Sequence, residues 1–399
     1  MSLAEATAFT FICPIPTLLF SLTTTDLVPT WARTALQILL LCLDLYIPFY
    51  VRGRYDPYLL SVAGTACIAI GMKMLVWISG GEREKGNFFW TLWFWREEMP
   101  RREVMTKEDI NGADSDPQQK NKTMTEANVS FILCIRFWIL LFKLILLDLL
   151  DTILKRTAVA TPSQPYLLRL LHAPYETLTA HTLLHSLLFA SVLYVQMLCY
   201  YEVFTVLFAF TLLLLLRNPG RLSPQYEVAA HHYLIVHLVT APSLFSAPYL
   251  SSSSRDLWSH RWHQMFTPLF RRLARDPTAR TLDVLGAPAW LRASASRLAV
   301  FTLSGLMHEY ILLVICGTAW WDQGVGGWQT VFFLIQAVAV ATAREGGKQE
   351  RSLVMWIKVA VMMAWIVVMV PIFIEPYVRS GYHLAKRLPL IPSLVEAVW

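Results

Sequence analysis

The sequence is poor in charged residues and has no motif typical of a nucleic-acid-binding protein. Charged residues make up 16% of its 399 positions, whereas hydrophobic residues make up 55%. A soluble domain usually carries about a quarter charged residues, so this deficit indicates a membrane-embedded chain. The formal net charge of +6 accompanies no RNP, helix-turn-helix or finger pattern, and we expect no nucleic-acid partner.

Paired cysteines are also absent. The six cysteines are scattered, mostly inside apolar runs, and none forms a CxxC pair. This pattern indicates neither a disulfide framework nor a zinc knuckle, and we expect no metal site. Thiols on apolar faces are most simply small core residues. The cysteines are Cys13, Cys42, Cys67, Cys134, Cys199 and Cys316.

Neither a cleavable signal peptide nor a repeat of fixed period is evident in the sequence, and we expect no cleaved leader. Its first residues carry no basic region ahead of the apolar run, so this run is expected to remain as a first membrane segment. A helix needs about 20 mainly apolar residues to cross the hydrocarbon. Ten candidates are 7–24, 34–51, 58–79, 131–150, 181–199, 201–216, 229–249, 295–317, 328–343 and 353–375. Since they show no period-2 alternation, we expect an all-α polytopic bundle of about eight to ten transmembrane helices, with 1–399 as one integral membrane domain.

Basic residues gather in two segments. Eight lie in 80–130 and seven in 251–293, whereas 318–327 has none. With ten spans in alternation, the positive-inside rule places both basic segments in the cytosol and 318–327 in the lumen. The stretch 104–129 is expected to be disordered. Its two glycosylation sequons, at Asn121 and Asn128, would then face the cytosol and stay bare.

Several ionisable residues lie inside the apolar spans, where they are costly and often functional. Arg136 and Lys143 share one helical face, and either snorkelling or pairing with an acid such as Asp148 would explain them. The full set is Asp44, Lys73, Arg136, Lys143, His185, His237, His308, Glu309 and Lys358.

His308 is the strongest catalytic candidate among these residues. It lies near the middle of the span 295–317, in "FTLSGLMHEYILLV". Ser304 is four residues earlier on the same face, and Gly305 allows a helix or substrate to come close. A buried neutral imidazole can accept a proton from an alcohol, as a general base must. A hydrogen-bonded structural histidine is the alternative. Glu309 points about 100° away and is expected to pair with another helix.

The stretch "RDLWSHRWHQMF", from Arg255, follows the serine run "SSSS". If it is helical, Asp256, His260 and His263 fall on one side and Trp258 and Trp262 on another. The serines supply N-cap candidates. An amphipathic helix at the membrane interface would account for the tryptophans and arginines.

These residues carry a family resemblance. "SSSRDLWSHRWHQMF", followed 45 residues after His263 by His308 in "SGLMHE", resembles the membrane-bound O-acyltransferases, specifically their wax-synthase-like branch. That branch typically shows Ser-Leu-Arg-Asp-Phe-Trp-x-x-Arg-Trp-His/Asn and then Ser-Gly-x-x-His. This chain has Leu257 where Phe is usual, and no Leu between Ser254 and Arg255.

By position, the resemblance makes His308 the catalytic histidine and His263 the second polar group of the centre. Asp256, Trp258, Arg261 and Trp262 match the scaffold residues of the motif. The implied reaction transfers an acyl group from coenzyme A to a hydroxyl, without a permanent cofactor. The arginines of the 251–293 segment could attract coenzyme A, although positive-inside bias explains them equally well. They are Arg271, Arg272 and Arg275.

The resemblance also suggests partners and location. Many short members of this branch resemble fungal membrane acetyltransferases of secondary metabolism. The compact length, with no long soluble N-terminal region, favours acetyl transfer from acetyl-CoA to a hydroxylated terpenoid or meroterpenoid. We expect a multi-pass protein of the endoplasmic reticulum that contacts an acyl-CoA donor, a hydrophobic alcohol and membrane lipid. The oligomeric state stays open.

Four other functions can be compared with this interpretation. A long-chain wax ester synthase would use the same chemistry on a fatty alcohol. A transporter would line its path with Arg136, Lys143 and Glu309, but inverted repeats are not visible. The pair His181 and His185 has the HxxxH spacing of a di-iron oxygenase, yet no HxxHH box occurs. A zinc protease would need a second histidine at a fixed spacing after His308-Glu309, and none is present.

Overall fold

The computed structural model describes residues 14–25, 28–80, 88, 126–157, 163–217, 244–343 and 352–385. Over these ranges the chain forms helices and turns, and the only β pairing is an isolated bridge between Arg52 and Tyr55. Six helices within the same ranges are long and apolar enough to cross a membrane. The all-α polytopic class is therefore confirmed. Most of the predicted span 229–249, residues 7–13 of the predicted span 7–24 and the sequon at Asn121 lie outside the described residues.

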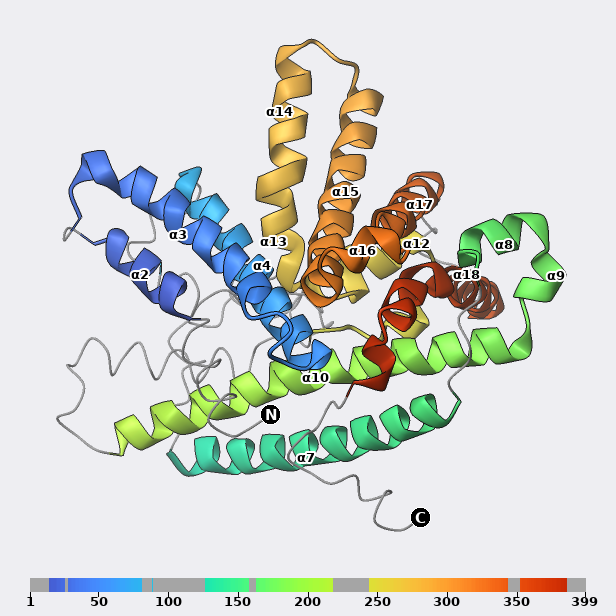
Figure 1. Ribbon diagram of the computed structural model, residues 1–399, viewed down its shortest axis with the longest axis horizontal. Helices are drawn as coiled ribbons and strands as arrows, with labels where there is room; N and C mark the ends of the chain where they lie inside the picture. Colours follow the sequence, from blue (N-terminus) through green and yellow to red (C-terminus); the bar gives the residue numbers. More distant parts are fainter. Residues whose placement is uncertain are drawn as a thin grey trace, which may run out of the picture.

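Three N-terminal helices pack in chain order and lead to the centre of the molecule (Figure 1). They are α2 (Ile15–Thr23), α3 (Thr30–Tyr50) and α4 (Pro57–Ile78). Helix α4 begins where Asp56 accepts a hydrogen bond from the Tyr58 N–H at 2.8 Å, and a proline at the first helical position suits this cap. Helix α4 then packs against α15 (Ala289–Cys316), which carries His308.

Helices α7 (Glu126–Arg156) and α10 (Ala180–Leu216) run side by side along one edge of the molecule (Figure 1). The predicted spans 181–199 and 201–216 form one continuous helix, because no Pro or Gly interrupts α10 near Tyr200. At 37 residues, α10 is about 55 Å long and must tilt or project beyond the hydrocarbon. The strict alternation of ten spans is wrong here, so the shared cytosolic side of the two basic segments stays a prediction. Helix α7 begins within 104–129, so the last four residues of that stretch are helical rather than disordered.

A buried carboxylate joins α7 to α10. Glu202 of α10 is 2% exposed and contacts Arg136 Nη1 at 3.2 Å and Lys143 Nζ at 3.0 Å. The two cations on one face of α7 thus pair with an acid, as predicted, and this acid lies on the neighbouring helix. This explains how Glu202 is tolerated inside a long apolar helix, since a buried charge needs a partner.

Replacing Glu202 with Ala is expected to destabilise the chain by about 3 kcal/mol, because both cations would lose their carboxylate in a largely desolvated site. Unfolding in detergent micelles measures this effect. Arg292→Ala is the matched control, since Arg292 pairs with Asp283 and the two side chains are 36% and 66% exposed. Such a pair is worth less than about 1 kcal/mol. Equal stability changes in the two variants would contradict the structural role of Glu202.

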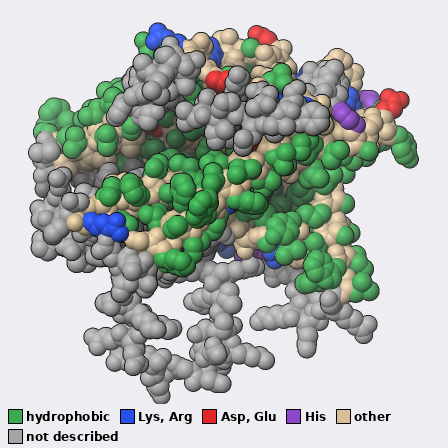
Figure 2. All heavy atoms as spheres, turned by 90° about the horizontal axis from the view of Figure 1, so that it is seen from below, with side chains coloured by type: hydrophobic (Ala, Val, Ile, Leu, Met, Phe, Trp, Pro, Cys, Tyr) green, Lys and Arg blue, Asp and Glu red, His purple; other side chains and the backbone are tan. Residues whose placement is uncertain are grey.

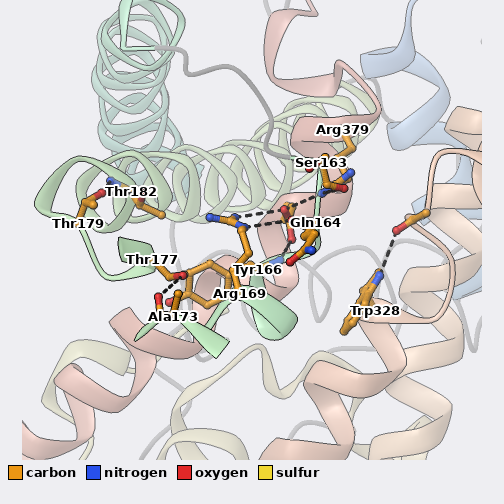
Figure 3. Close-up of polar contacts among 12 residues, drawn as sticks. Ser163, Gln164, Tyr166, Arg169, Ala173, Thr177, Thr179, Thr182, Trp328 and Arg379 are labelled. Atoms are coloured by element: carbon orange, nitrogen blue, oxygen red, sulfur yellow. Dashed lines mark hydrogen bonds and ion pairs between the residues drawn. The ribbon is translucent and has the colours of Figure 1, made fainter. Parts of the chain in front are cut away.

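The C-terminal helix α18 (Ser352–Arg379) contacts the short helix α8 (Tyr166–His172) through its residue Glu375. Figure 3 shows Tyr166 and Arg169 of α8 near Arg379 of α18. The Glu375 carboxylate accepts from the Tyr166 N–H and contacts Arg169 at 3.5 Å and Arg379 at 3.1 Å. The Tyr166 hydroxyl also donates to the Val368 carbonyl at 3.0 Å. Helix α18 packs in addition on α10 and on α17 (Trp328–Thr342), so it closes the bundle around the site described below.

Most of the predicted motif loop 251–293 is helical and leads into α15. Helices α14 and α15 form a hairpin that extends from the bundle (Figure 1), and Arg292 pairs with Asp283 across it. The short elements around this region are α9 (Pro174–Thr177), η5 (Pro248–Leu250), α12 (Ser254–Asp256), η6 (Leu257–Arg261), η7 (Gln264–Phe266), α13 (Thr267–Phe270), η8 (Arg271–Arg275), α14 (Asp276–Val284), α16 (Ala319–Asp322) and η9 (Tyr382–Leu384).

The outer surface on the α7 side is mainly hydrophobic. Among the side chains that Figure 2 colours by type, hydrophobic ones predominate on this face, and most of the charged ones lie towards its edges. On α7, Phe131, Trp138 and Phe142 are each more than 60% exposed. Exposed apolar area of this extent is expected where a protein meets lipid, in agreement with a multi-pass membrane protein.

Candidate active site

His308 lies in the middle of α15 with its ring between two phenylalanines. The Phe333 ring of α17 stacks on it at 5.1 Å and 17°, and the Phe373 ring of α18 meets it edge-on at 5.0 Å. Its Nδ1 atom is enclosed and has no hydrogen-bond partner within the described part of the chain. The imidazole is therefore positioned by aromatic packing rather than tied to another polar side chain. This geometry does not match the hydrogen-bonded structural histidine considered above.

His263 follows the end of η6 and lies against three aromatic rings. Ring centroids of Trp262, Phe266 and Phe245 lie 5.5, 5.2 and 6.1 Å away. The side chain is 8% exposed, and burial lowers the pKa of His263 to about 4, because a charged imidazole loses its hydration there. His263 is consequently neutral near pH 7.

The predicted helix over 255–266 is not continuous. Helix α12 and the π-helical turn η6 end at Arg261, and Trp262 is extended. His260 and His263 therefore do not share a face: the His260 side chain is 61% exposed, and its Nδ1 lies 3.9 Å from Asp256. The break in the helix turns His263 inward. One serine of the run does cap the helix, since Ser253 Oγ accepts from the Asp256 N–H at 3.1 Å.

An ion pair holds this turn in shape. Arg261 Nε donates to Asp256 Oδ2 at 2.7 Å. The same guanidinium donates through Nη1 to the carbonyl oxygens of Ser246 and Ala247, each at 3.2 Å. Ala247 adopts a left-handed conformation with φ of 45°, which costs energy for a residue other than glycine. Asp256 and Arg261 thus hold the motif turn against the backbone at 246–247 and lie where they can position His263.

The two motif tryptophans form part of the aromatic wall. Trp258 and Trp262 meet edge-on at 5.8 Å. Trp258 Nε1 donates to Gln336 Oε1 at 3.3 Å, and Trp365 Nε1 donates to the same oxygen at 3.3 Å. Gln336 is fully buried on α17 and was not singled out in the sequence. The one available signal was a lone glutamine in the apolar run "FFLIQAVAV".

Gly305 and Glu309 organise the contact between α15 and α17, and Ser304 lies next to them in α15. Ser304 and Gly305 are buried, and a Cβ built on Gly305 would lie 2.7 Å from Thr330 Cα. Glu309 faces α17, where Oε1 accepts from the Thr330 N–H at 3.1 Å, and Oε2 accepts from Trp320 Nε1 at 3.1 Å. The carboxylate thereby satisfies an amide in the first turn of α17, where negative charge is favourable.

Gly305→Ala is expected to destabilise the chain by about 1 to 3 kcal/mol, because its methyl group would displace the backbone of α17. Gly64→Ala is the matched control, since a Cβ there would meet only Val314 at an ordinary 3.5 Å. Thermal unfolding in detergent compares the two variants. Equal midpoints would contradict the close approach of α15 and α17.

The three arginines proposed for coenzyme A lie outside the pocket that holds the histidines. Arg271 and Arg275 are exposed on η8, Arg272 is half-buried, and none of them lines the cavity. Arg271 Nε lies 3.7 Å from Asp276 Oδ2. Their place on the surface suits contact with the anionic part of a ligand as well as ordinary positive-inside bias.

His263 and His308 line one cavity of about 700 Å³. Its wall is mainly apolar and comes from α4, α10, α15, α17, α18 and the motif turn, with Trp258, Trp262, Phe333 and Phe373 near the two histidines. This volume lies in the range of small-molecule sites, about 300 to 1,000 Å³. His308 is half-buried because the cavity adjoins its ring. A cavity of this kind could hold a hydrophobic molecule next to both imidazoles.

The histidines of the oxygenase alternative do not join this site. His181 is exposed, and the buried His185 ring packs against His383 at 6.3 Å. His231, His232 and His237 lie outside the described residues. Within the described ranges, no three His, Cys, Asp or Glu side chains come together as a metal site.

The lowered pKa of His263 predicts a pH-dependent stability. The unfolded chain binds a proton on this residue below about pH 6.5, whereas the folded chain does so only near pH 4. The contribution of His263 to the free energy of unfolding is therefore fully present above pH 6.5 and is lost as the pH drops towards 4. Between pH 7.5 and pH 5 the expected loss is about 2 kcal/mol. Unfolding of wild type and His263→Asn at both pH values tests this. An equal loss in the variant would assign the effect to other groups.

Comparison with known proteins gives partial matches that centre on this region. Residues 241–335 match the family described as "Membrane bound O-acyl transferase family". An "Acyl-CoA--sterol O-acyltransferase 1" of Arabidopsis thaliana is 37% identical over 67 residues, which are 17% of this chain and 19% of that protein. A "Long-chain-alcohol O-fatty-acyltransferase" of Simmondsia chinensis is 32% identical over 98 residues, 24% of this chain and 26% of the relative.

A third relative, a "Probable long-chain-alcohol O-fatty-acyltransferase 1" of Arabidopsis thaliana, is 32% identical over 100 residues, 25% of this chain and 27% of its own length. The matches thus span about a fifth to about a quarter of each relative's length. Together with the family match, they confirm the resemblance to the membrane-bound O-acyltransferases and to their wax-synthase-like branch.

Proposed function

Because residues 241–335 carry the signature of the membrane bound O-acyl transferase family, we propose that this chain is an acyl-CoA-dependent O-acyltransferase acting on a hydrophobic alcohol. The observation that carries this proposal is that His308 and His263 line one mainly apolar cavity inside a membrane bundle. A hydrophobic alcohol can enter such a space, and a base for its hydroxyl proton is present there.

The proposed reaction uses His308 as the general base. The alcohol oxygen attacks the thioester carbonyl carbon while a nitrogen of His308 takes the hydroxyl proton, so a C–O bond forms. The tetrahedral intermediate then collapses, the C–S bond breaks, and the proton passes from His308 to the departing thiolate. An ester and free coenzyme A result. A neutral imidazole held by Phe333 and Phe373 suits both proton transfers.

His263 is assigned a supporting part in this reaction. It is neutral near pH 7 because burial lowers its pKa to about 4, so one ring N–H can donate a hydrogen bond. A hydrogen-bond donor aimed at the carbonyl oxygen of the thioester would stabilise the negative charge that develops on this oxygen. The apolar wall around both imidazoles excludes water, which would otherwise hydrolyse the thioester. The arginines of η8 are proposed to attract the anionic part of acyl-CoA from the membrane surface.

For the substrates, we propose acetyl transfer from acetyl-CoA to a hydroxyl of a terpenoid-type natural product. The flat rings that surround His308 support a ring-containing acceptor, since Phe333, Phe373 and Trp258 can pack against a polycyclic skeleton. Long-chain wax ester synthesis is the second candidate, and it is supported by two relatives that are named as long-chain-alcohol O-fatty-acyltransferases. Both candidates share the same chemistry at His308.

A microsomal assay separates the two candidates. Microsomes that contain the chain receive labelled acetyl-CoA or palmitoyl-CoA together with a terpenoid alcohol, a sterol or hexadecanol. The expected result is terpenoid acetate above the level in microsomes without the chain. Predominant formation of hexadecyl palmitate would replace the first candidate with the second. If none of these esters forms, the proposed activity is contradicted.

A further inference from the structure

A polar cluster lies in the same cavity, away from the two histidines. Gln196 of α10 donates through Nε2 to the hydroxyl oxygens of Tyr200 at 2.9 Å and Tyr382 at 3.1 Å. All three side chains line the cavity. Gln196 is 4% exposed and Tyr382 is fully buried. Residues about 180 positions apart in the chain therefore place an amide and two phenols on one part of a largely apolar wall.

The position of this cluster relative to His308 follows from a row of rings. Phe373 of α18 contacts the His308 ring, and Tyr377 lies one helical turn later with its ring 5.7 Å from Phe373. The Tyr382 ring lies 5.5 Å from that of Tyr377. One turn of α-helix advances about 6 Å along the axis, so the polar cluster and the imidazole are on the order of 10 Å apart in the same space.

Polar groups on the wall of an apolar cavity have an energetic consequence for any occupant. Tyr200 is the half-buried member of the cluster, and a purely hydrocarbon ligand that covered its hydroxyl would take it from water without offering a hydrogen bond, which costs free energy. A ligand oxygen in the same place would interact with the amide and the phenols. Sites with such groups discriminate strongly between ligands that carry the matching oxygen and ligands that lack it. The mechanism at His308 makes no use of this cluster.

We infer that Gln196, Tyr200 and Tyr382 form a subsite for a second oxygen of the acceptor. The acceptor class is then a rigid polycyclic diol or hydroxyketone, whose acylated hydroxyl lies at His308 and whose other oxygen lies on the order of 10 Å away. An unfunctionalised fatty alcohol lacks this second oxygen. The inference rests on the proposed function, because it takes His308 as the position of the reacting hydroxyl.

The test compares two acceptors that differ only in the second oxygen. One is a steroid hydroxyketone with the ketone at the far end of the rings from the hydroxyl, and the other is the same steroid alcohol without the ketone. In wild-type microsomes with acetyl-CoA, the KM of the mono-alcohol is expected to be about tenfold higher. In Gln196→Leu and Tyr382→Phe the difference should shrink to about twofold or less, through a rise in the KM of the hydroxyketone alone.

Tyr310→Phe is the matched control for loss of a phenol in the same core. The Tyr310 hydroxyl donates to the Leu45 carbonyl at 2.7 Å and does not line the cavity. This variant should keep the tenfold ratio. The inference is overturned if wild type has the same KM for the two steroids, or if Gln196→Leu and Tyr382→Phe raise both KM values equally. The cluster would then only connect α10 to the C-terminal region.

Binding of the tritiated hydroxyketone to purified full-length chain separates this inference from the proposed function. Should no alcohol be esterified at all, the proposed activity fails, and the subsite is still decided by binding. Tighter binding of the hydroxyketone than of the mono-alcohol in wild type, lost in Gln196→Leu, supports the subsite. Equal binding of the two steroids overturns it.

Discussion

His308→Ala is expected to lower ester formation by about 10²- to 10⁴-fold at unchanged protein abundance, the range that general-base catalysis supplies. In the structure this imidazole contacts Phe333 and Phe373 and faces the cavity, so its removal deletes the proton acceptor without breaking a hydrogen bond of the bundle. Microsomes with matched amounts of each variant give the comparison. The KM of acyl-CoA should change little, because the loss belongs to the chemical step.

His260→Ala is the matched control for this variant. His260 belongs to the same motif region, yet its side chain is 61% exposed and lies on the other side of the helix break from His263. Its activity should stay within about twofold of wild type, as expected for a surface position. Retained turnover in His308→Ala would remove this residue from the mechanism.

The second large effect is expected at His263. His263→Ala should lower the rate by about 10²-fold, because it removes a buried donor beside the developing oxyanion. His263→Asn should recover a substantial part of that loss, since an amide N–H can replace the ring N–H, and since relatives of this branch carry His or Asn at the corresponding position. His308→Asn should recover nothing, because an amide is not a base. These different responses distinguish a donor from a proton acceptor.

The outcome for His263→Ala separates two accounts of the site. A rate close to that of wild type would confine the essential chemistry to α15 and leave Asp256 and Arg261 as a clamp with a purely structural purpose. A reduced rate with an unchanged unfolding midpoint at pH 7.5 would assign His263 to the reaction. The measurement requires both initial rates and stability, because His263 also packs on Trp262 and Phe266.

Local sequence patterns predicted the class of the molecule and pointed to the two histidines that line its cavity. The apolar runs predicted a helical membrane bundle. The histidine within "SGLMHE" could be picked out as a candidate base, because a buried neutral imidazole can accept a proton from an alcohol. The serine cap at Ser253 was also predictable, because capping depends on residues within one turn. The orientation of Glu309 towards α17 follows from helical geometry.

Features that depend on distant residues were beyond local patterns. Periodicity placed His263 on a helix face with His260, whereas the Asp256–Arg261 clamp to the 246–247 backbone ends the helix and turns His263 inward. The pairing of Glu202 with Arg136 and Lys143 was also beyond local patterns, because these partners lie about 60 residues earlier in the chain. The cavity arises only when helices far apart in the sequence pack together with the motif turn. The cluster at Gln196 forms only where α10 meets η9.

The most direct test of the central claim uses purified full-length chain in lipid nanodiscs with acyl-CoA and an alcohol labelled with ¹⁸O at its hydroxyl. The account predicts ester and free coenzyme A in a one-to-one ratio, with the ¹⁸O retained in the ester, and loss of both products together in His308→Ala. Release of coenzyme A without ester, or equal amounts of ester from wild type and His308→Ala, would contradict it.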